Sequence, residues 1–246
     1  MNLFLVKERL VRMIADYYAL EKIHALERTL QYMQGKLNQP RLVFKLRQEI
    51  VQRKADAALV AVMITLLPKE KQEFFRLRYQ KKMPLVFVAP KLYISPKVAG
   101  VWNAEILERL YALREGIVGD FILSPQALCA VESYLNTILD FFLAEGMKYA
   151  DPAYIRKLET RKDSLFQLRL YMEQYLEKVN AQERQLLLSW CNDPCLTYVE
   201  LAGRFYVSES TAGRYVLRFK GAMFIFWEAL GKKMKGKSEM DFAEFY

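Results

Sequence analysis

Apolar side chains recur along this chain with the spacing of α-helices. Between residues 3 and 36 they alternate in steps of four and three, at Val6, Leu10, Met13, Tyr17, Leu20 and His24. Residues 153–179 show the same rhythm, at Leu165, Leu168, Met172, Tyr175 and Val179. Such a stripe is typical of a helix that packs lengthwise on another helix. The pattern predicts long paired helices, with His24 at a helix interface.

Prolines and small polar residues predict where these helices begin and end. Pro40 interrupts the first stripe, and a second helix is expected from about residue 41 to residue 67. Ser124 and Asp151 each precede a proline, so each can cap a helix whose first position is that proline. The chain has only 10 Gly and 8 Pro, which is few for a β-rich protein. The predicted fold class is therefore all-α.

The second half of the chain repeats the first at a shift of 113 residues. Residues 70–105 align without a gap on residues 183–218, and eight of the 36 pairs are identical. The identical pairs include positions of the expected turns and helix caps, for example Tyr93 with Tyr206. The chain therefore reads as a duplicated unit.

Each predicted unit has long packed helices followed by a trihelical helix-turn-helix segment. The first unit spans residues 1–118, with long helices in 3–67 and the helix-turn-helix in 69–114. The second spans residues 119–246, with long helices in 124–179, the helix-turn-helix in 181–231 and a tail in 232–246.

The second copy carries the clearer helix-turn-helix pattern. Thr197 and Glu200 form a capping box for a helix over about 198–205, and Tyr206 begins the turn. Ser208 caps the next helix, whose first turn would enter the major groove of DNA. Base edges would be read by Ser208, Glu209, Ser210 and Arg214. Thr211 and Tyr215 lie on the same helix, and phosphates would be held by Arg218, Lys220 and Arg204. The alternative is a helical bundle with a solvated basic face.

The first copy departs from this pattern. Pro84 stands where the second copy has Thr197, Pro90 falls inside the expected middle helix, and Val101 replaces Arg214. Cations lie elsewhere, at Arg76, Arg78, Lys81, Lys82, Lys91 and Lys97. The first copy therefore holds DNA by its phosphates, binds protein, or presents a solvated face.

Charge is distributed unevenly between the halves. The net charge is +9, from 37 Lys and Arg against 28 Asp and Glu. Residues 1–118 carry 21 basic against 11 acidic residues, and residues 119–246 carry 16 against 17. This distribution predicts that the first unit binds DNA independently of sequence and that the second unit reads bases.

Several other classes of protein are not expected. The chain has no glycine-rich phosphate loop, so we expect no enzyme of that kind and no cofactor. Three cysteines and one histidine form neither a disulfide framework nor a zinc site, so no metal is expected. Charge follows the N-terminus too early for a signal peptide, and the apolar run 57–68 is too short for a bilayer. These features predict a soluble, cytoplasmic protein without a membrane partner.

The second copy also resembles a known family. The residues Leu201, Ala202, Tyr206, Val207, Ser208, Ser210, Thr211 and Arg214 resemble the signature of sigma-factor region 4. With residues 183–188 before it, the segment is similar to phage late-transcription regulators of the ArpU/RinA type. The resemblance covers about 50 residues of each half, whereas that family usually has a single copy. It implies promoter DNA binding and contact with RNA polymerase.

The sequence thus predicts a sequence-specific regulator of transcription that binds double-stranded DNA. The long helices would provide spacing, a homodimer interface or contact with polymerase. Two alternatives stay open. One is a phage DNA-packaging or assembly recognition subunit, and the other is a polymerase-binding factor that does not itself read DNA.

Overall fold

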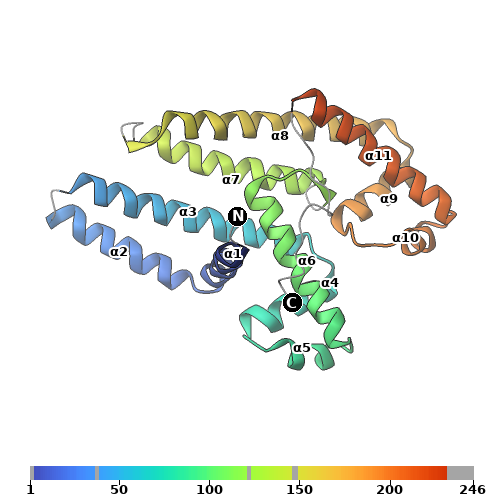
Figure 1. Cartoon of the computed structure of the whole chain (residues 1–246), viewed down its shortest axis with the longest axis horizontal. Helices are drawn as coiled ribbons and strands as arrows, with labels where there is room; N and C mark the ends of the chain where they lie inside the picture. The colour runs from blue at the N-terminus through green and yellow to red at the C-terminus, as the bar shows by residue number, and fades with distance from the viewer. Residues whose placement is uncertain (1–2, 37–38, 121–122, 146–148, 232–246) are drawn as a thin grey trace.

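The computed structural model describes residues 3–36, 39–120, 123–145 and 149–231, and the secondary structure of these residues is helical, without strands. Figure 1 shows the arrangement of the helices. In chain order they are α1 (Leu3–Tyr18), α2 (Leu20–Lys36), α3 (Pro40–Thr65), α4 (Lys69–Phe75), the π-helical turn η1 (Arg76–Gln80), α5 (Leu85–Lys91), α6 (Pro96–Glu115), α7 (Pro125–Ala144), α8 (Pro152–Lys178), α9 (Ala181–Asn192), α10 (Tyr198–Phe205) and α11 (Glu209–Ala229). The predicted tail 232–246 lies outside the described residues.

The sequence signals for helix starts are confirmed. Ser124 accepts a hydrogen bond from the backbone N–H of Ala127 at 3.0 Å, and Asp151 accepts one from Ala153 at 2.9 Å. Pro40 begins α3, where its missing N–H costs nothing. The termini of three long helices thus follow from local chemistry.

The expectation of one helix over residues 3–36 is wrong. The chain turns at Ala19, where Ala19 donates to the carbonyl of Asp16 and Lys22 donates to that of Ala19. The turn rotates α2, so Ile23 is buried while His24 is exposed. His24 therefore does not lie at a helix interface within the chain.

The long helices form a row in the order α2, α3, α7, α8 (Figure 1). The centre of the row joins the two halves of the chain, because α3 packs on α7. Phe44 of α3 meets Phe141 of α7 with ring centroids 5.4 Å apart. Gln52 and Asp56 of α3 both hydrogen-bond to the hydroxyl of Tyr134 on α7, the latter at 3.0 Å. The predicted long-helix pairing thus exists inside one chain.

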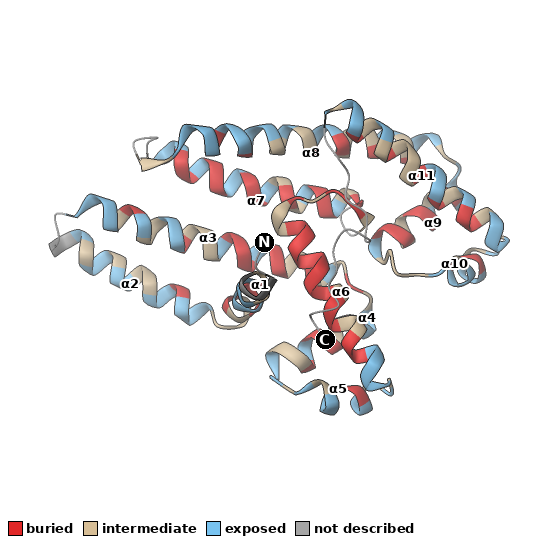
Figure 2. Ribbon diagram, viewed as in Figure 1, coloured by how far each residue is buried: buried red, intermediate tan, exposed pale blue. Residues whose placement is uncertain are grey.

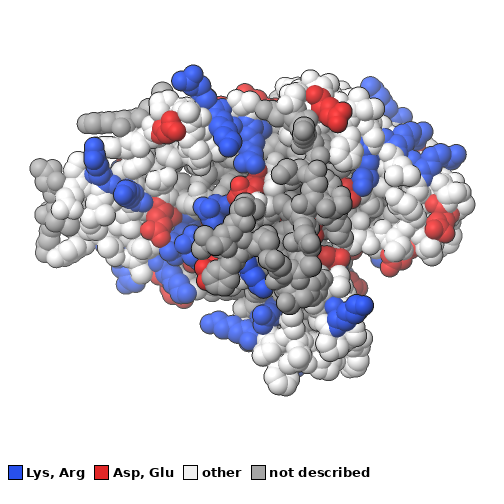
Figure 3. Space-filling view, in the orientation of Figure 1, with Lys and Arg blue, Asp and Glu red and all other residues white. Residues whose placement is uncertain are grey.

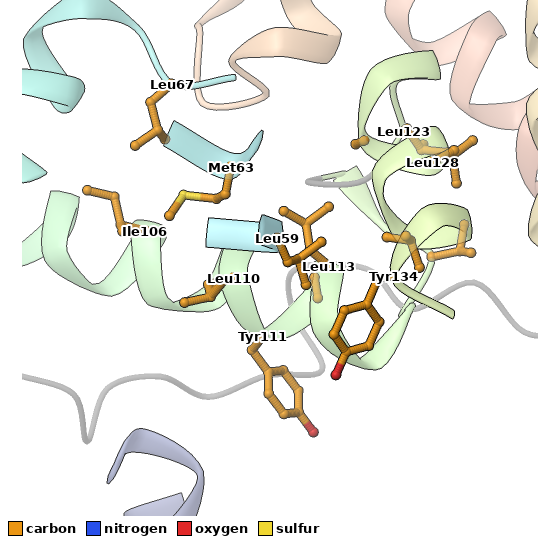
Figure 4. Packing of buried hydrophobic residues seen from close by; sticks show 14 of the residues in the cluster. Leu59, Met63, Leu67, Ile106, Leu110, Tyr111, Leu113, Leu123, Leu128 and Tyr134 are labelled. Atoms are coloured by element: carbon orange, nitrogen blue, oxygen red, sulfur yellow. The ribbon is translucent and has the colours of Figure 1, made fainter. Parts of the chain in front are cut away.

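Helix α6 is the most deeply buried element of the first half (Figure 2). Its apolar side chains meet those of α3 and α7 in one cluster, shown in Figure 4: Leu59, Met63, Leu67, Ile106, Leu110, Tyr111, Leu113, Leu123, Leu128 and Tyr134. The cluster continues across residues 116–120, where the two predicted units meet. The halves therefore share a hydrophobic core.

A buried ionic cluster also joins the halves. Lys71 of α4 lies 3.0 Å from the carboxylate of Glu105 on α6 and 3.3 Å from that of Asp193, which follows α9. Arg109 donates to the backbone carbonyls of Leu66 and Asn192 at 3.1 and 3.0 Å. These polar contacts fix α4 and α6 against the end of α9.

Backbone features recur at the 113-residue shift. Tyr93 and Tyr206 both adopt the left-handed conformation, with φ of 55° and 53°, and both side chains are almost fully exposed. Ser95 caps α6 and Ser208 caps α11, each by accepting from the N–H three residues on. One difference is that the helix preceding α5 ends in a π-helical turn, whereas α9 is a regular α-helix.

Helix α7 is the one described helix that is long and apolar enough to cross a membrane by length and composition alone. Half of its apolar window is buried within the chain, so this one helix is weak evidence for a membrane span.

Candidate nucleic-acid interface

Helix α10 begins with the predicted capping box. The hydroxyl of Thr197 accepts from the N–H of Glu200 at 3.2 Å, and the carboxylate of Glu200 accepts from the N–H of Thr197 at 2.7 Å. The hydrogen bonds that the Glu200 carboxylate accepts from the backbone N–H and from the hydroxyl of Thr197 lower the pKa of Glu200. The box fixes the start of the helix that supports α11.

A tight turn sets the angle between α10 and α11. Tyr206 ends α10 in the left-handed conformation, and the N–H of Val207 donates to the carbonyl of Ala202 at 3.2 Å. Ser208 then caps α11, and its hydroxyl also donates to the hydroxyl of Thr211 at 2.9 Å. Ser208 and Thr211 therefore stabilise the first turn of α11.

Helix α11 sits very close to α10. A Cβ atom added at Gly213 would lie 3.2 Å from the ring of Tyr198, closer than ordinary contacts allow. Below it, Phe219 is fully buried and its ring lies edge-on to Trp190 of α9, with centroids 6.2 Å apart. The inner face of α11 is thus anchored, and its outer face is left to solvent.

The outer face of α11 forms one side of a shallow groove. Its lining residues are Tyr198, Ser208, Glu209, Ser210, Gly213, Arg214, Leu217 and Arg218. Ser210, Arg214 and Arg218 follow one another at steps of four, so they share a face of the helix. Figure 3 shows Lys and Arg side chains on the end of the molecule that contains α9 and α11.

Tyr215 holds both arginines of this face. The guanidinium carbons of Arg214 and Arg218 lie 5.8 and 5.7 Å from the centroid of its ring. Arg218 also forms an ion pair with the buried carboxylate of Glu183, and this hydrogen bond raises the pKa of Arg218. About half of the Arg218 side chain stays exposed, so it is available to a ligand while Glu183 holds it.

Two predicted contacts lie elsewhere. Arg204 lines a different groove, beside the end of α3 and the start of α4. Lys220 pairs with Asp120 at 2.8 Å and lies 5.7 Å from the ring centroid of Trp190. The structure therefore groups Arg214 with Arg218 but separates both from Arg204 and Lys220.

In the first half, two of the predicted cations have partners within the chain. Arg76 forms an ion pair with Glu73, and Arg78 donates to the carbonyl of Met83 at 3.0 Å. The other four are exposed: Lys81, Lys82, Lys91 and Lys97. Glu105, which aligns with Arg218, pairs inward with Lys71.

The same segment exposes apolar side chains. Val86 and Phe87 of α5 are 62% and 60% exposed, and Tyr93 is 96% exposed. Pro90 lies one residue before the end of α5, which has seven residues against eight in α10. The two segments thus share a left-handed tyrosine and a serine cap, but they expose different side chains.

Four contributors to the groove and its support were not predicted from the sequence. Tyr198, Gly213 and Leu217 line it, and Glu183 holds Arg218. Leu217 lies three residues after Arg214, a helical spacing that could have flagged it. Glu183 lies 35 residues from Arg218, and no local signal connects them.

No group of three His, Cys, Asp or Glu side chains suited to a metal ion occurs among the residues that the structure describes. A comparison of the chain with protein-family models, with curated proteins and with solved structures finds no match. The function is therefore inferred from the residues of this chain alone.

Proposed function

We propose that the protein is a sequence-specific regulator of transcription that binds double-stranded DNA through α11. One observation carries the proposal. In the first turns of α11, Ser208, Glu209, Ser210 and Arg214 line one open groove, next to Arg218. A helix with a free N-terminal end, small polar residues and flanking cations suits the major groove.

The proposal includes two helix-turn-helix units in one chain. The shared left-handed tyrosines and serine caps, 113 residues apart, support a duplication of α4–α6 as α9–α11. The tight turn at Tyr206 and the close approach at Gly213 are what a helix-turn-helix pair requires. No cofactor is part of the proposal, and the cytoplasm is the compartment it requires.

The roles of the site residues follow from their contacts. Arg214 is the base-reading cation, because its guanidinium is exposed beside the helix start. Arg218 contacts a phosphate, and its ion pair with Glu183 fixes one side of its guanidinium group. Lys220 is left out of the interface because Asp120 already binds it.

Binding-site selection on random duplex DNA, followed by fluorescence anisotropy on the selected sequence, tests this function. Arg214→Ala should weaken specific binding by about 1–3 kcal/mol, the usual cost of a lost base contact. Arg204→Ala removes the same charge outside the groove and is the matched control, with a smaller effect expected. Failure to enrich any sequence, or equal losses in the two variants, would count against base reading by α11.

A second candidate function is binding of RNA polymerase, the partner that the sigma-factor resemblance implies. The observation that favours it is the exposed apolar surface of α5, with Phe87 at its centre. Phe87→Ala should weaken co-purification with RNA polymerase by about tenfold, a typical effect of losing a central aromatic contact. Ile225→Ala, at a 72% exposed residue on α11, is the matched control. Equal binding of all three proteins would remove this candidate.

The packaging-subunit alternative predicts a large ring. Light scattering that reports a monomer or dimer favours the regulator, whereas a ring-sized particle favours the assembly subunit.

A further inference from the structure

A second cavity lies away from the α11 groove, where α6, α8 and α11 meet. It has a volume of about 590 Å³, within the range of small-molecule sites. Its lining comes from the end of α6 and the residues after it, from the middle of α8, and from Trp227 near the end of α11. In Figure 1 the end of α11 crosses α8 at this place. None of the predicted DNA-binding residues lines this cavity.

The cavity carries an excess of positive charge. Arg156, Lys157 and Arg161 of α8 line it, against one carboxylate, Glu115. Glu115 already accepts a hydrogen bond from Arg114, whose side chain is almost fully buried. One carboxylate therefore faces three cations, so the lining keeps a net positive charge.

Arg161 is the most informative of these cations. It is half-buried, and among the described residues it forms no ion pair or hydrogen bond. Partial burial lowers the pKa of Arg161, because desolvation disfavours its charged form. Guanidinium groups withdrawn from water are normally paired with an anion. The one carboxylate of the lining, Glu115, attracts Arg161 without forming an ion pair with it, and it is already hydrogen-bonded to Arg114.

Gly116 makes the room that Arg161 occupies. Its φ of +56° is left-handed, and a Cβ atom added there would lie 3.0 Å from Nε of Arg161. Glycine suits this position for two reasons: the left-handed backbone conformation favours it, and a Cβ atom would crowd the side chain of Arg161.

Trp227 forms an aromatic wall of the cavity. The residue is 5% exposed, and its indole nitrogen has almost no accessible surface, so a ligand in the cavity meets the ring and not the N–H. The ring offers a flat apolar surface to a ligand.

The hydroxyls of the cavity complete the chemistry. Thr160 and Ser164 donate to the backbone carbonyls of Arg156 and Thr160, at 2.8 and 2.7 Å. With their protons used, both oxygens can only accept from a ligand. The lining thus combines cations, hydroxyl acceptors and an aromatic wall.

We infer that this cavity binds a small phosphate ester of mononucleotide size. Arg161 and its neighbours on α8 hold the phosphate, the hydroxyls accept from a sugar, and Trp227 packs on the flat or apolar part. The inference does not depend on DNA binding by α11. Bound ligand would connect three helices and so raise the melting temperature of the protein.

Titration calorimetry and thermal melting with three probes test the inference: adenosine monophosphate, glucose 6-phosphate and adenosine. At least one of the two phosphate esters should bind and raise the melting temperature, and adenosine should bind at least about tenfold more weakly than that ester. Arg161→Gln should weaken ester binding by about tenfold or more, as expected for a lost charge-assisted hydrogen bond. Lys162→Gln, the neighbouring cation that does not line the cavity, is the matched control and should bind within about twofold of the parent.

Arg156→Gln removes an exposed cation of the lining, so it gives a second readout if Arg161→Gln folds poorly. It should weaken ester binding by several fold, with the unliganded melting temperature nearly unchanged. Two results would overturn the inference. One is the absence of any ester binding at millimolar concentration. The other is an Arg161→Gln variant that loses affinity for duplex DNA while its affinity for the esters is unchanged, which would assign the cations to the DNA backbone.

Discussion

Arg218 has two tasks at the scale of single residues. It faces the groove of α11, and it is the ionic partner of Glu183, whose side chain is only 3% exposed. A buried carboxylate that loses its partner retains the cost of desolvation. A loss of DNA binding in an Arg218 variant would therefore mix two causes.

Replacing Arg218 should reveal the structural task. Arg218→Ala should lower the free energy of unfolding by about 1–3 kcal/mol, because Glu183 is left unpaired. The double variant Glu183→Gln with Arg218→Ala should be more stable than Arg218→Ala alone, since the unpaired charge is gone. Urea unfolding of the parent, of Arg218→Ala, of Glu183→Gln and of the double variant measures this cycle. An Arg218→Ala variant as stable as the parent would mean that solvent replaces the arginine fully.

At the scale of elements, α10 depends on its capping box. Thr197→Ala should lower the free energy of unfolding by about 1 kcal/mol at neutral pH. Thr29→Ala is a matched control, because that hydroxyl only donates to the carbonyl of Ala25 within α2.

The effect of Thr197→Ala should depend on pH. The folded pKa of Glu200 is lowered by its bonds to Thr197, so its contribution is present above the ordinary glutamate pKa. The contribution disappears as pH falls through the lowered folded value, when Glu200 takes up a proton. The difference between parent and Thr197→Ala should therefore shrink below about pH 4, where glutamate normally titrates. A difference that stays constant from neutral to acid pH would contradict this role of Glu200.

Most helix boundaries were predictable because their causes are local. Pro40, Ser124 and Asp151 act within a few residues of the boundary they define. The turn at Ala19 was not predictable, because no glycine or proline marks it. Tyr18, next to the turn, packs on Phe75 with ring centroids 6.0 Å apart, a contact between distant parts of the chain.

The candidate site was predictable in part. The sequence placed Arg214 and Arg218 on the helix that begins after Ser208, and both line one groove in the structure. Spacing alone could not show that Lys220 is bound by Asp120, 100 residues earlier. Distant partners therefore decide which cations of a predicted interface remain open to a ligand.

At the scale of the whole molecule, the shared core and the Lys71 cluster should make the halves unfold together. Trp102 reports on the first half and Trp190 on the second, so variants that keep only one of these tryptophans can follow each half. Their urea midpoints should coincide with each other and with the loss of helical circular dichroism. Two separate midpoints would show that residues 1–118 and 119–246 are independent domains.

The pairing of α3 with α7 also has a consequence for synthesis on the ribosome. The hairpin α2–α3 can close as soon as it emerges, because its contacts are local. The face of α3 that carries Phe44 must wait for α7, whose last residue follows Thr65 by 79 positions. At ordinary elongation rates this wait is on the order of ten seconds. During that time the nascent first half exposes an apolar strip that chaperones would recognise.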